Sequence, residues 1–253
     1  MKQKKKKINN FSIIIEARMS SSRLPGKVML PLNNIPSIHY LINRISCVKN
    51  VDNIIVATTN NTNDDILVNY LKKNKIKYFR GSESNVLERV LKTAIKFNVK
   101  NIVQITGDCP LIDPRLVSQT VNTYISNNAD YVSNSTIRTY PDGMDIAIFS
   151  TKSLKEVSLL TQNKNDLEHV TLYYKKNFKK YKTINIMAPS EHHLPDLGLT
   201  LDEISDYKLI SKIVKKLHSN KSIFSLDDIL KFLNKNKSMR SINKKVKRKK
   251  VKL

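Results

Sequence analysis

Cysteine is scarce in this sequence. Only two cysteines, Cys47 and Cys109, occur among 253 residues. Two cysteines cannot build a disulfide framework, and their spacing matches no metal-binding motif. The sequence therefore excludes a small disulfide-stabilised secreted protein, and we expect a cytoplasmic protein with reduced thiols.

Long apolar runs are also missing. No stretch approaches the roughly 20 apolar residues that a membrane-spanning helix needs. Near the N-terminus only residues 11–15 are mainly apolar, and Glu16 and Arg18 follow at once. This run is too short for the apolar core of a signal peptide. We expect neither a signal peptide nor a membrane span.

Acidic residues are few compared with basic ones. The chain has 45 lysines and arginines against 21 aspartates and glutamates, a formal net charge of +24. Residues 1–7 hold five lysines and residues 231–253 hold eleven basic residues, with no acid in either segment. The remaining body keeps 29 basic residues against all 21 acids. Because the body lacks any nucleic-acid-binding motif, the charge is weak evidence for nucleic-acid binding.

The composition is otherwise that of a folded protein. Apolar residues make up 40% of the chain, which excludes wholesale disorder. We predict one folded domain over residues 8–230, a basic N-terminal extension over 1–7 and a basic, disordered tail over 231–253. We expect neither flanking segment to take part in catalysis.

Strand-like and helix-like segments alternate along the first half of the chain. This pattern predicts an α/β protein with a mostly parallel sheet covered by helices on both faces. The second half is less regular. Predicted strands cover residues 12–16, 53–58, 76–79, 101–106, 129–132, 145–149, 183–187 and 197–201. Predicted helices cover residues 35–48, 64–71, 86–97, 114–125, 153–160, 166–178, 203–217 and 226–233.

The loop after the first predicted strand is rich in cations and hydroxyl groups. Ligands of open α/β sheets bind beyond the carboxyl ends of strands. There, backbone amides and serines can cradle phosphate oxygens, and cations can neutralise a triphosphate. The loop is neither a Walker P-loop nor a G-x-G-x-x-G motif, so a solvated basic loop is the alternative. It reads Ala17-Arg18-Met19-Ser20-Ser21-Ser22-Arg23-Leu24-Pro25-Gly26-Lys27.

This loop resembles the signature loop of bacterial cytidylyltransferases of the spore-coat polysaccharide biosynthesis protein F type. That type is related to CMP-KDO synthetases and acylneuraminate cytidylyltransferases. Further segments resemble family motifs in the same order: Val56-Ala57-Thr58, Arg80-Gly81-Ser82, residues 106–113, Asp130-Tyr131, residues 140–145, Glu168-His169-Val170 and residues 200–203. The resemblance implies a three-layer α/β/α, Rossmann-like fold of the nucleotide-diphospho-sugar-transferase type. It also implies transfer of CMP from CTP to a sugar acid or related sugar, with release of pyrophosphate, for polysaccharide biosynthesis.

The resemblance also implies roles for individual residues. It makes Lys27, Arg18 and Arg23 catalytic cations on the triphosphate, and Asp108 and Asp202 ligands of Mg²⁺. The implied nucleotide-binding residues are Ala17, Arg18, Met19, Ser20, Ser22, Arg23, Lys27, Arg80, Gly81 and Ser82. The implied acceptor-binding residues are Tyr140, Asp142, Asp145, Glu168 and His169. CTP and a small sugar are the implied partners, together with a second copy of the chain in a homodimer.

Several of these residues also have a structural interpretation. An aspartate close before a proline, as Asp108 is to Pro110, is common at helix starts and in turns, and Asp202 could cap the helix that follows. Ser82 could cap the helix after it, and a lone histidine such as His169 is more often structural than catalytic. Cys109 is interpreted as a packing residue.

Two alternative functions remain at this stage. Glycosyltransferases of the GT-A type share the implied fold, but they usually carry an Asp-x-Asp metal motif where this chain has Asp108-Cys109-Pro110. Nucleic-acid binding rests on the basic tails alone. The chain also departs from the resembled family at Glu16, where glutamine is common.

Overall fold

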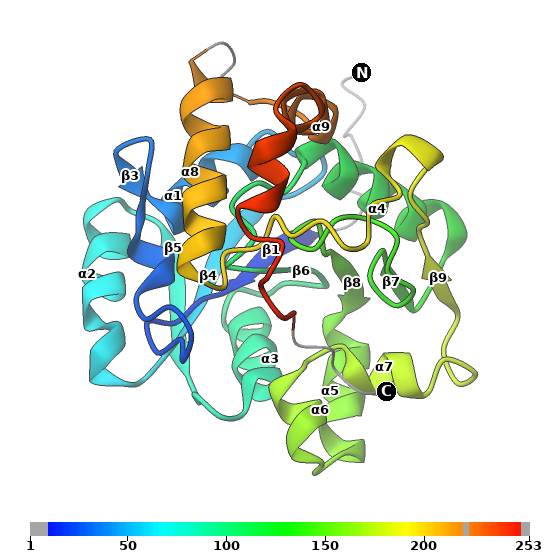
Figure 1. Ribbon diagram of the computed structural model, residues 1–253. Helices are drawn as coiled ribbons and strands as arrows, with labels where there is room; N and C mark the ends of the chain where they lie inside the picture. Colours follow the sequence, from blue (N-terminus) through cyan, green and yellow to red (C-terminus); the bar gives the residue numbers. More distant parts are fainter. Residues whose placement is uncertain (1–9, 220–222, 249–253) are drawn as a thin grey trace, which may run out of the picture.

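A seven-stranded sheet forms the centre of the molecule (Figure 1). The computed structural model describes residues 10–219 and 223–248. The sheet order is β5-β4-β1-β6-β8-β7-β9, and β8 is antiparallel to both its neighbours while all other pairs are parallel. The strands are β1 (Phe11–Glu16), β4 (Asn53–Thr59), β5 (Lys77–Gly81), β6 (Asn101–Thr106), β7 (Tyr131–Ser133), β8 (Ala147–Ser150) and β9 (Thr183–Asn185), and a separate hairpin pairs β2 (Pro31–Leu32) with β3 (Ile35–Pro36). The predicted mostly parallel sheet is confirmed.

Helices cover both faces of this sheet (Figure 1). One buried apolar cluster includes side chains of α1 (Ser37–Ile45), α2 (Asp65–Lys73), α4 (Pro114–Asn127), α8 (Ile204–His218) and α9 (Leu226–Lys235). The other includes side chains of α3 (Val86–Lys96), α5 (Thr151–Leu160) and α7 (Leu172–Lys176). Along β1, Ile13 and Ile15 belong to the first cluster and Ile14 to the second, as expected when successive side chains point to opposite faces. The three-layer α/β/α fold is confirmed.

The strand order places the loops after β1 and β6 side by side. From β1 the chain moves outward through β4 to β5, and then returns to the other side of β1 as β6. Ligands of open α/β sheets bind at such a switch point. Because β1 and β6 pair in parallel up to Glu16 and Thr106, the loops that follow them leave the same edge of the sheet.

The second half of the chain differs from the prediction at two places. Residues 197–201 form no strand, and only a single bridge joins Gly198 to Asp142. The predicted helix over residues 166–178 is two short helices, α6 (Lys164–Glu168) and α7, because the backbone leaves the helical conformation at His169. The short 3₁₀ helices are η1 (Lys27–Met29), η2 (Thr62–Asp64), η3 (Ser190–His192) and η4 (Lys237–Ser241).

The predicted tail also needs correction. Helix α9 continues through Lys235, past the boundary at residue 230, and η4 follows it. Leu233 is buried, and Met239 and Ile242 pack against the larger apolar cluster. These apolar residues, spaced among lysines, make residues 231–248 part of the body rather than a disordered tail. The predicted extension over residues 1–7 and the end of the tail over 249–253 lie outside the described residues.

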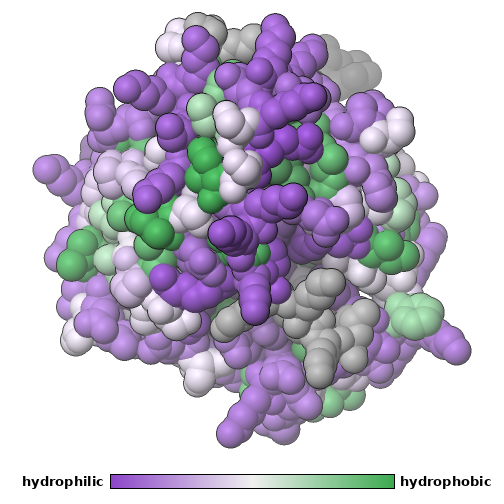
Figure 2. All heavy atoms as spheres, viewed as in Figure 1, coloured by the Kyte–Doolittle hydropathy of each residue, from purple (hydrophilic) through white to green (hydrophobic). Residues whose placement is uncertain are grey.

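The surface agrees with the absence of long apolar runs. Figure 2 shows a mainly hydrophilic face with apolar residues in scattered patches. Among the described residues, no helix is both long and apolar enough to cross a membrane.

Candidate active site

Lys27 lies at the centre of a charged cluster. Its Nζ is 2.7 Å from Oδ2 of Asp108 and 3.0 Å from Oδ1 of Asp202. Lys27 ends the loop after β1, Asp108 lies in the loop after β6, and Asp202 lies just before Glu203, the residue that precedes α8. Three segments that are far apart in the sequence therefore meet at the carboxyl edge of β1 and β6. We call these three residues the Lys27 cluster.

Lys27 and Asp108 stabilise each other's charged forms. Burial acts to lower the pKa of Lys27, but Asp108 and Asp202 outweigh burial and raise it above its ordinary value. Burial likewise acts to raise the pKa of Asp108, yet Lys27 and the hydroxyl of Thr106 hold it below its usual range. The Thr106 hydroxyl donates to Oδ1 of Asp108 at 2.6 Å. Lys27 thus lies as an ammonium against the ionised Asp108, and the side chain of Asp202 lies on its other side.

Asp108 and Asp202 contact cations, and other residues cap the helices that follow them. Glu203, not Asp202, is the N-cap of α8, and it forms a capping box with Asp206. The carboxylate of Asp202 instead faces Lys27 with one oxygen and Nη2 of Arg23, at 3.0 Å, with the other. Asp113, not Asp108, caps α4. The capping interpretation of Asp202 is therefore wrong.

Backbone contacts fix the segment that leads to Asp202. The N–H of Leu201 donates to the carbonyl oxygen of Asp108 at 2.8 Å, and the N–H of Leu199 donates to that of Asp142 at 2.6 Å. Buried leucines alternate along this segment, which explains why it resembles a strand in sequence. Its backbone bonds go to two loops rather than to the sheet.

Gly143 allows the closest of these approaches, and we expect Gly143→Ala to be strongly destabilising. Its φ is 102°, and a Cβ at this position would lie 2.5 Å from the carbonyl carbon of Leu199. The strained backbone and the overlap should together lower the free energy of unfolding by about 2 kcal/mol or more. Urea denaturation of the natural protein and of the Gly143→Ala variant measures this difference in the free energy of unfolding. An unchanged midpoint would show that the two segments do not touch as described.

The loop after β1 is held by hydrogen bonds within its own backbone and to a buried aspartate. The N–H of Met19 donates to Oδ1 of Asp64 at 2.6 Å, and its carbonyl oxygen accepts the N–H of Gly26 at 2.9 Å. Gly26 has a φ of 71°, a conformation that favours glycine. Asp64 is 1% exposed and also accepts hydrogen bonds from Thr58 and Thr59. Asp64 could not be recognised as a site residue from the sequence, because two acids at a helix start indicate only a favourable helix terminus.

The remaining residues of this loop have mixed placements. Arg23 belongs with Asp202, whereas Arg18 lies 3.7 Å from Glu83. The hydroxyl of Ser20 also donates to Glu83, and this bond is the main cause of the lowered pKa of Glu83. Ala17 is buried and Ser22 is exposed. Glu83 is a second residue that sequence reasoning missed.

Arg80 and Ser82 have structural partners. Arg80 donates from Nε to the carbonyl of Thr59 at 2.8 Å, from Nη1 to Asp65 at 2.7 Å and from Nη2 to the carbonyl of Asn61 at 2.9 Å. The hydroxyl of Ser82 accepts the N–H of Asn85, the N-cap of α3, at 3.0 Å. Gly81 is buried at the end of β5. None of the contacts described for these three residues reaches the Lys27 cluster.

The predicted acceptor residues divide into two groups. Arg138 donates to both oxygens of Asp145, at 2.8 and 2.6 Å, and lies 3.3 Å from Asp142. Burial and the nearby Asp145 raise the pKa of Asp142 to about 6. Tyr140 is 4% exposed and its ring lies beside His192. Arg138 was missed by sequence reasoning, because it lies outside the motif and meets it only through a turn.

Glu168 and His169 form the second group. Both are exposed, Glu168 at the end of α6 and His169 just after it. No described side-chain hydrogen bond or ion pair joins either residue to the other predicted site residues. Asp142 lies near enough to Asp202 for that residue to help raise its pKa, and Arg138 joins Asp142 to Asp145. Within the described residues, no hydrogen bond or ion pair joins Glu168 or His169 to the Lys27 cluster.

Glu16, at the end of β1, has an unusual protonation behaviour. Burial raises its pKa to about 7, against the opposing effects of Arg89 and of a hydrogen bond from Gln104. Between about pH 5 and 7 the folded state therefore binds a proton that the unfolded state has lost. Stability from this group is present at low pH and is lost as the pH rises through 7.

We expect Glu16→Gln to remove this pH dependence. From pH 5 to pH 8 the free energy of unfolding of the natural protein should fall by up to about 3 kcal/mol relative to the variant, since glutamine does not titrate. Chemical denaturation of both proteins at the two pH values gives the difference. Parallel pH profiles would contradict a raised pKa at Glu16.

Few of the described side chains are placed to bind a metal ion. Within residues 10–219 and 223–248, no group of three or more His, Cys, Asp or Glu side chains is placed to hold a metal ion. Asp108 and Asp202 are two carboxylates that share one cation, Lys27. Cys109 is 2% exposed, and burial raises the pKa of its thiol well above the ordinary value, as expected for a packing residue.

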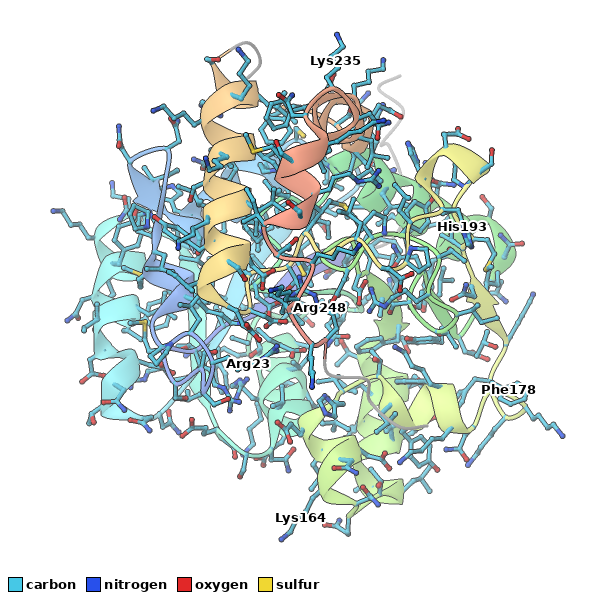
Figure 3. The ribbon with its side chains drawn as sticks, viewed as in Figure 1. Arg23, Lys164, Phe178, His193, Lys235 and Arg248 are labelled. Atoms are coloured by element: carbon cyan, nitrogen blue, oxygen red, sulfur yellow. The ribbon has the colours of Figure 1, made fainter. Side chains whose placement is uncertain are left out.

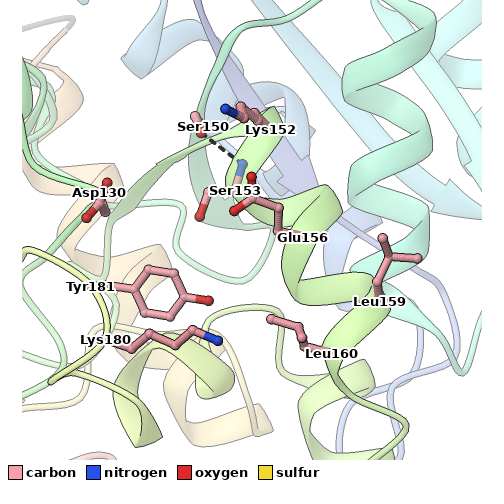
Figure 4. A pocket seen from close by; sticks show the side chains of 9 residues that line it. All are labelled: Asp130, Ser150, Lys152, Ser153, Glu156, Leu159, Leu160, Lys180 and Tyr181. Atoms are coloured by element: carbon pink, nitrogen blue, oxygen red, sulfur yellow. Dashed lines mark hydrogen bonds between the residues drawn. The ribbon is translucent and has the colours of Figure 1, made fainter.

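A pocket of about 550 Å³ lies elsewhere, beside α5 (Figure 4). Its lining includes Asp130, Ser153, Glu156 and Tyr181. None of the predicted site residues lines it. The charged cluster, rather than this pocket, is the candidate site.

Comparison with known proteins decides the family. A family model described as cytidylyltransferase matches residues 12–232. The chain belongs to the cytidylyltransferase family. Spore coat polysaccharide biosynthesis protein SpsF of Bacillus subtilis (strain 168) is 31% identical over 234 residues, covering 90% of this chain and 96% of that protein.

Solved structures give the same assignment. A cytidylyltransferase from Leptospira borgpetersenii is 32% identical, with a TM-score of 0.85, over 91% of this chain and 96% of that one. A CMP:2-keto-3-deoxy-manno-octonic acid synthetase complexed with CTP has the same fold, with a TM-score of 0.62 at 16% identity, over 83% of this chain and 100% of that one. The resemblance inferred from the motifs is confirmed, and membership of this family makes the chain a nucleotidyltransferase rather than a glycosyltransferase.

Proposed function

We propose that the protein transfers CMP from CTP to an oxygen of a sugar acid or related sugar, releases pyrophosphate, and so supplies a surface polysaccharide or glycan. One observation carries the proposal: Lys27 lies between Asp108 and Asp202 at the switch point of the sheet. A cation and two carboxylates at the carboxyl ends of parallel strands suit nucleotide phosphates. Membership of the cytidylyltransferase family supports CTP as the nucleotide.

We further propose that Asp108 and Asp202 hold Mg²⁺. The two residues fit the ion because one oxygen of each already lies within 3.0 Å of a single positive charge. Mg²⁺ is commonly held by one or two carboxylates together with substrate phosphates. When bound, the ion would polarise the α-phosphate and neutralise developing charge.

The residues of the site then act mainly by position and charge. Lys27 and Arg23 would neutralise the triphosphate and the departing pyrophosphate. An oxygen of the acceptor forms a bond to the α-phosphorus, the bond from this phosphorus to the bridging oxygen breaks, and pyrophosphate leaves with the electron pair. The acceptor hydroxyl loses its proton to the surroundings. Little covalent chemistry is required of the protein.

The acceptor would bind beside Asp142 and Asp145. Carboxylates accept hydrogen bonds from sugar hydroxyl groups, and Arg138, held by both aspartates, offers a charge for a sugar acid. We place the reaction in the cytoplasm, where the two free cysteines stay reduced. A homodimer is the assembly that the resemblance implies.

Pyrophosphate release by the purified protein tests this function. Each nucleoside triphosphate is offered with Mg²⁺ and a panel of sugar acids, amino sugars and neutral sugars. We expect release with CTP and a restricted set of acceptors, loss of release in EDTA, and a product whose mass is that of the acceptor joined to CMP. Silence across the panel, or release of a nucleoside diphosphate from a nucleotide sugar, would contradict the proposal.

A further inference from the structure

The residues after α9 run beside α8 (Figure 1, red), and Asn243 reaches Asp206 in the first turn of that helix. Met239 and Ile242 pack against the larger apolar cluster, and Asn243 is 6% exposed. This C-terminal segment, residues 236–248, is therefore anchored to the body although it is rich in lysine. It lies beyond residues 12–232, the part that the family model matches.

Arg248 ends the described part of this segment and forms an ion pair with the buried Asp206. Its Nη1 donates to Oδ2 of Asp206 at 2.9 Å, and its Nη2 donates to Oδ1 at 2.6 Å. The side chain of Asp206 is 0% exposed, and Asn243 donates to its Oδ1 at 2.7 Å. Two parallel N–H groups on one carboxylate give a strong and directional contact.

Asp206 in turn holds the backbone on either side of Asp202. Its Oδ2 accepts the N–H of Asp202 at 3.1 Å and that of Glu203 at 2.9 Å. Arg248 also lies 3.7 Å from Oδ2 of Asp202 and 3.9 Å from Oδ2 of Asp142. Arg248 and Arg23 thus approach the same carboxylate from different segments (Figure 3).

We propose that Arg248 is a positioning residue of the active site, which acts through Asp206 to hold the carboxylate of Asp202 toward Lys27. The proposal rests on the proposed function and replaces the expectation that residues after 230 take no part in catalysis. Without Arg248, Asp206 remains buried but loses both guanidinium donors. Asp142, Asp202 and Asp206 would then repel one another, and the backbone before α8 would lose its fixed position.

Arg248→Ala in the full chain tests the proposal, with Lys247→Ala as the matched control. Lys247 is exposed and its loss removes the same charge. Arg248→Ala should speed hydrogen exchange at the amides of Asp202 and Glu203 while leaving β1 unchanged. It should weaken Mn²⁺ binding in the presence of CTP and lower kcat, each by about tenfold or more, with the KM for CTP within about threefold. The control should match the natural protein.

Arg248→Lys keeps the positive charge, but the ammonium of lysine lacks the planar guanidinium that donates two parallel hydrogen bonds to one carboxylate. It should fold normally and recover only part of the Mn²⁺ affinity, and it decides the question if Arg248→Ala does not fold. Natural Mn²⁺ affinity and turnover in either variant would overturn the proposal. If the natural protein releases no pyrophosphate from any nucleotide, the proposed function fails, and amide exchange still decides the role of Arg248: unchanged exchange at Asp202 and Glu203 would overturn it.

Discussion

Lys27→Ala is expected to lower pyrophosphate release from CTP by about a hundredfold or more. The ammonium of Lys27 contacts both candidate metal ligands, at 2.7 Å from Asp108 and 3.0 Å from Asp202. Removing a preorganised charge that faces a developing negative charge typically costs on the order of a hundredfold to a thousandfold in rate. Steady-state measurement of pyrophosphate with saturating CTP and acceptor gives the change in kcat.

The stability of Lys27→Ala should also depend on Mg²⁺. Without the ammonium, two carboxylates face each other across a partly buried site, so the melting temperature should fall. Mg²⁺ should restore part of it, because the ion and the ammonium use the same carboxylate oxygens. Lys49→Ala, at an exposed position, is the matched control and should be neutral in both assays. Near-natural turnover in Lys27→Ala would remove the central residue from the mechanism.

Asp108→Asn is the second change for which we expect a loss of about a hundredfold or more in turnover. The amide keeps the shape of the side chain but loses the charge that faces Lys27 and the proposed Mg²⁺. Asp108 is also the largest influence that raises the pKa of Lys27 against burial. In the variant this pKa should fall, so the ammonium should lose its proton more readily at high pH.

Turnover measured against Mg²⁺ concentration and against pH separates these effects. A higher requirement for Mg²⁺ and a loss of activity at lower pH than in the natural protein are expected together. Asp196→Asn, which removes the same charge at an exposed position, should leave both profiles unchanged. Natural turnover in Asp108→Asn at ordinary Mg²⁺ concentration would show that this carboxylate holds neither the ion nor Lys27 in the reaction.

The first half of the fold was predictable because its signals are local. Strands β1, β4 and β6 are short apolar runs, and α3 places its apolar residues on one face. Each of these elements can therefore be predicted without knowledge of its neighbours. The parallel arrangement follows from the alternation of strands and helices. The strand predicted over residues 197–201 is wrong because the prediction used only local signals. The alternating buried leucines of this segment match the strand pattern, whereas its backbone hydrogen bonds go to loops far away in the sequence.

The site was predictable only as far as motifs reach. Lys27, Asp108 and Asp202 were identified by resemblance to a family, and the structure brings them together. Glu83 and Arg248 were missed because their partners lie in distant segments. Asp64 and Arg138 were missed because a helix start and a turn, the local patterns around them, do not indicate a site. The basic composition of the C-terminal segment even pointed away from Arg248, since eleven cations without an acid predict a solvated tail.

The ion pair between Lys27 and Asp202 joins positions 175 residues apart. Closing a loop of that length is costly in entropy, so the pair can form only after the intervening sheet has been built. A chain still emerging from the ribosome contains the loop after β1 early, yet Lys27 in that loop has no Asp202 to pair with until synthesis approaches α8. Nucleotide chemistry is therefore a property of the finished chain, and an unfinished one should not consume CTP.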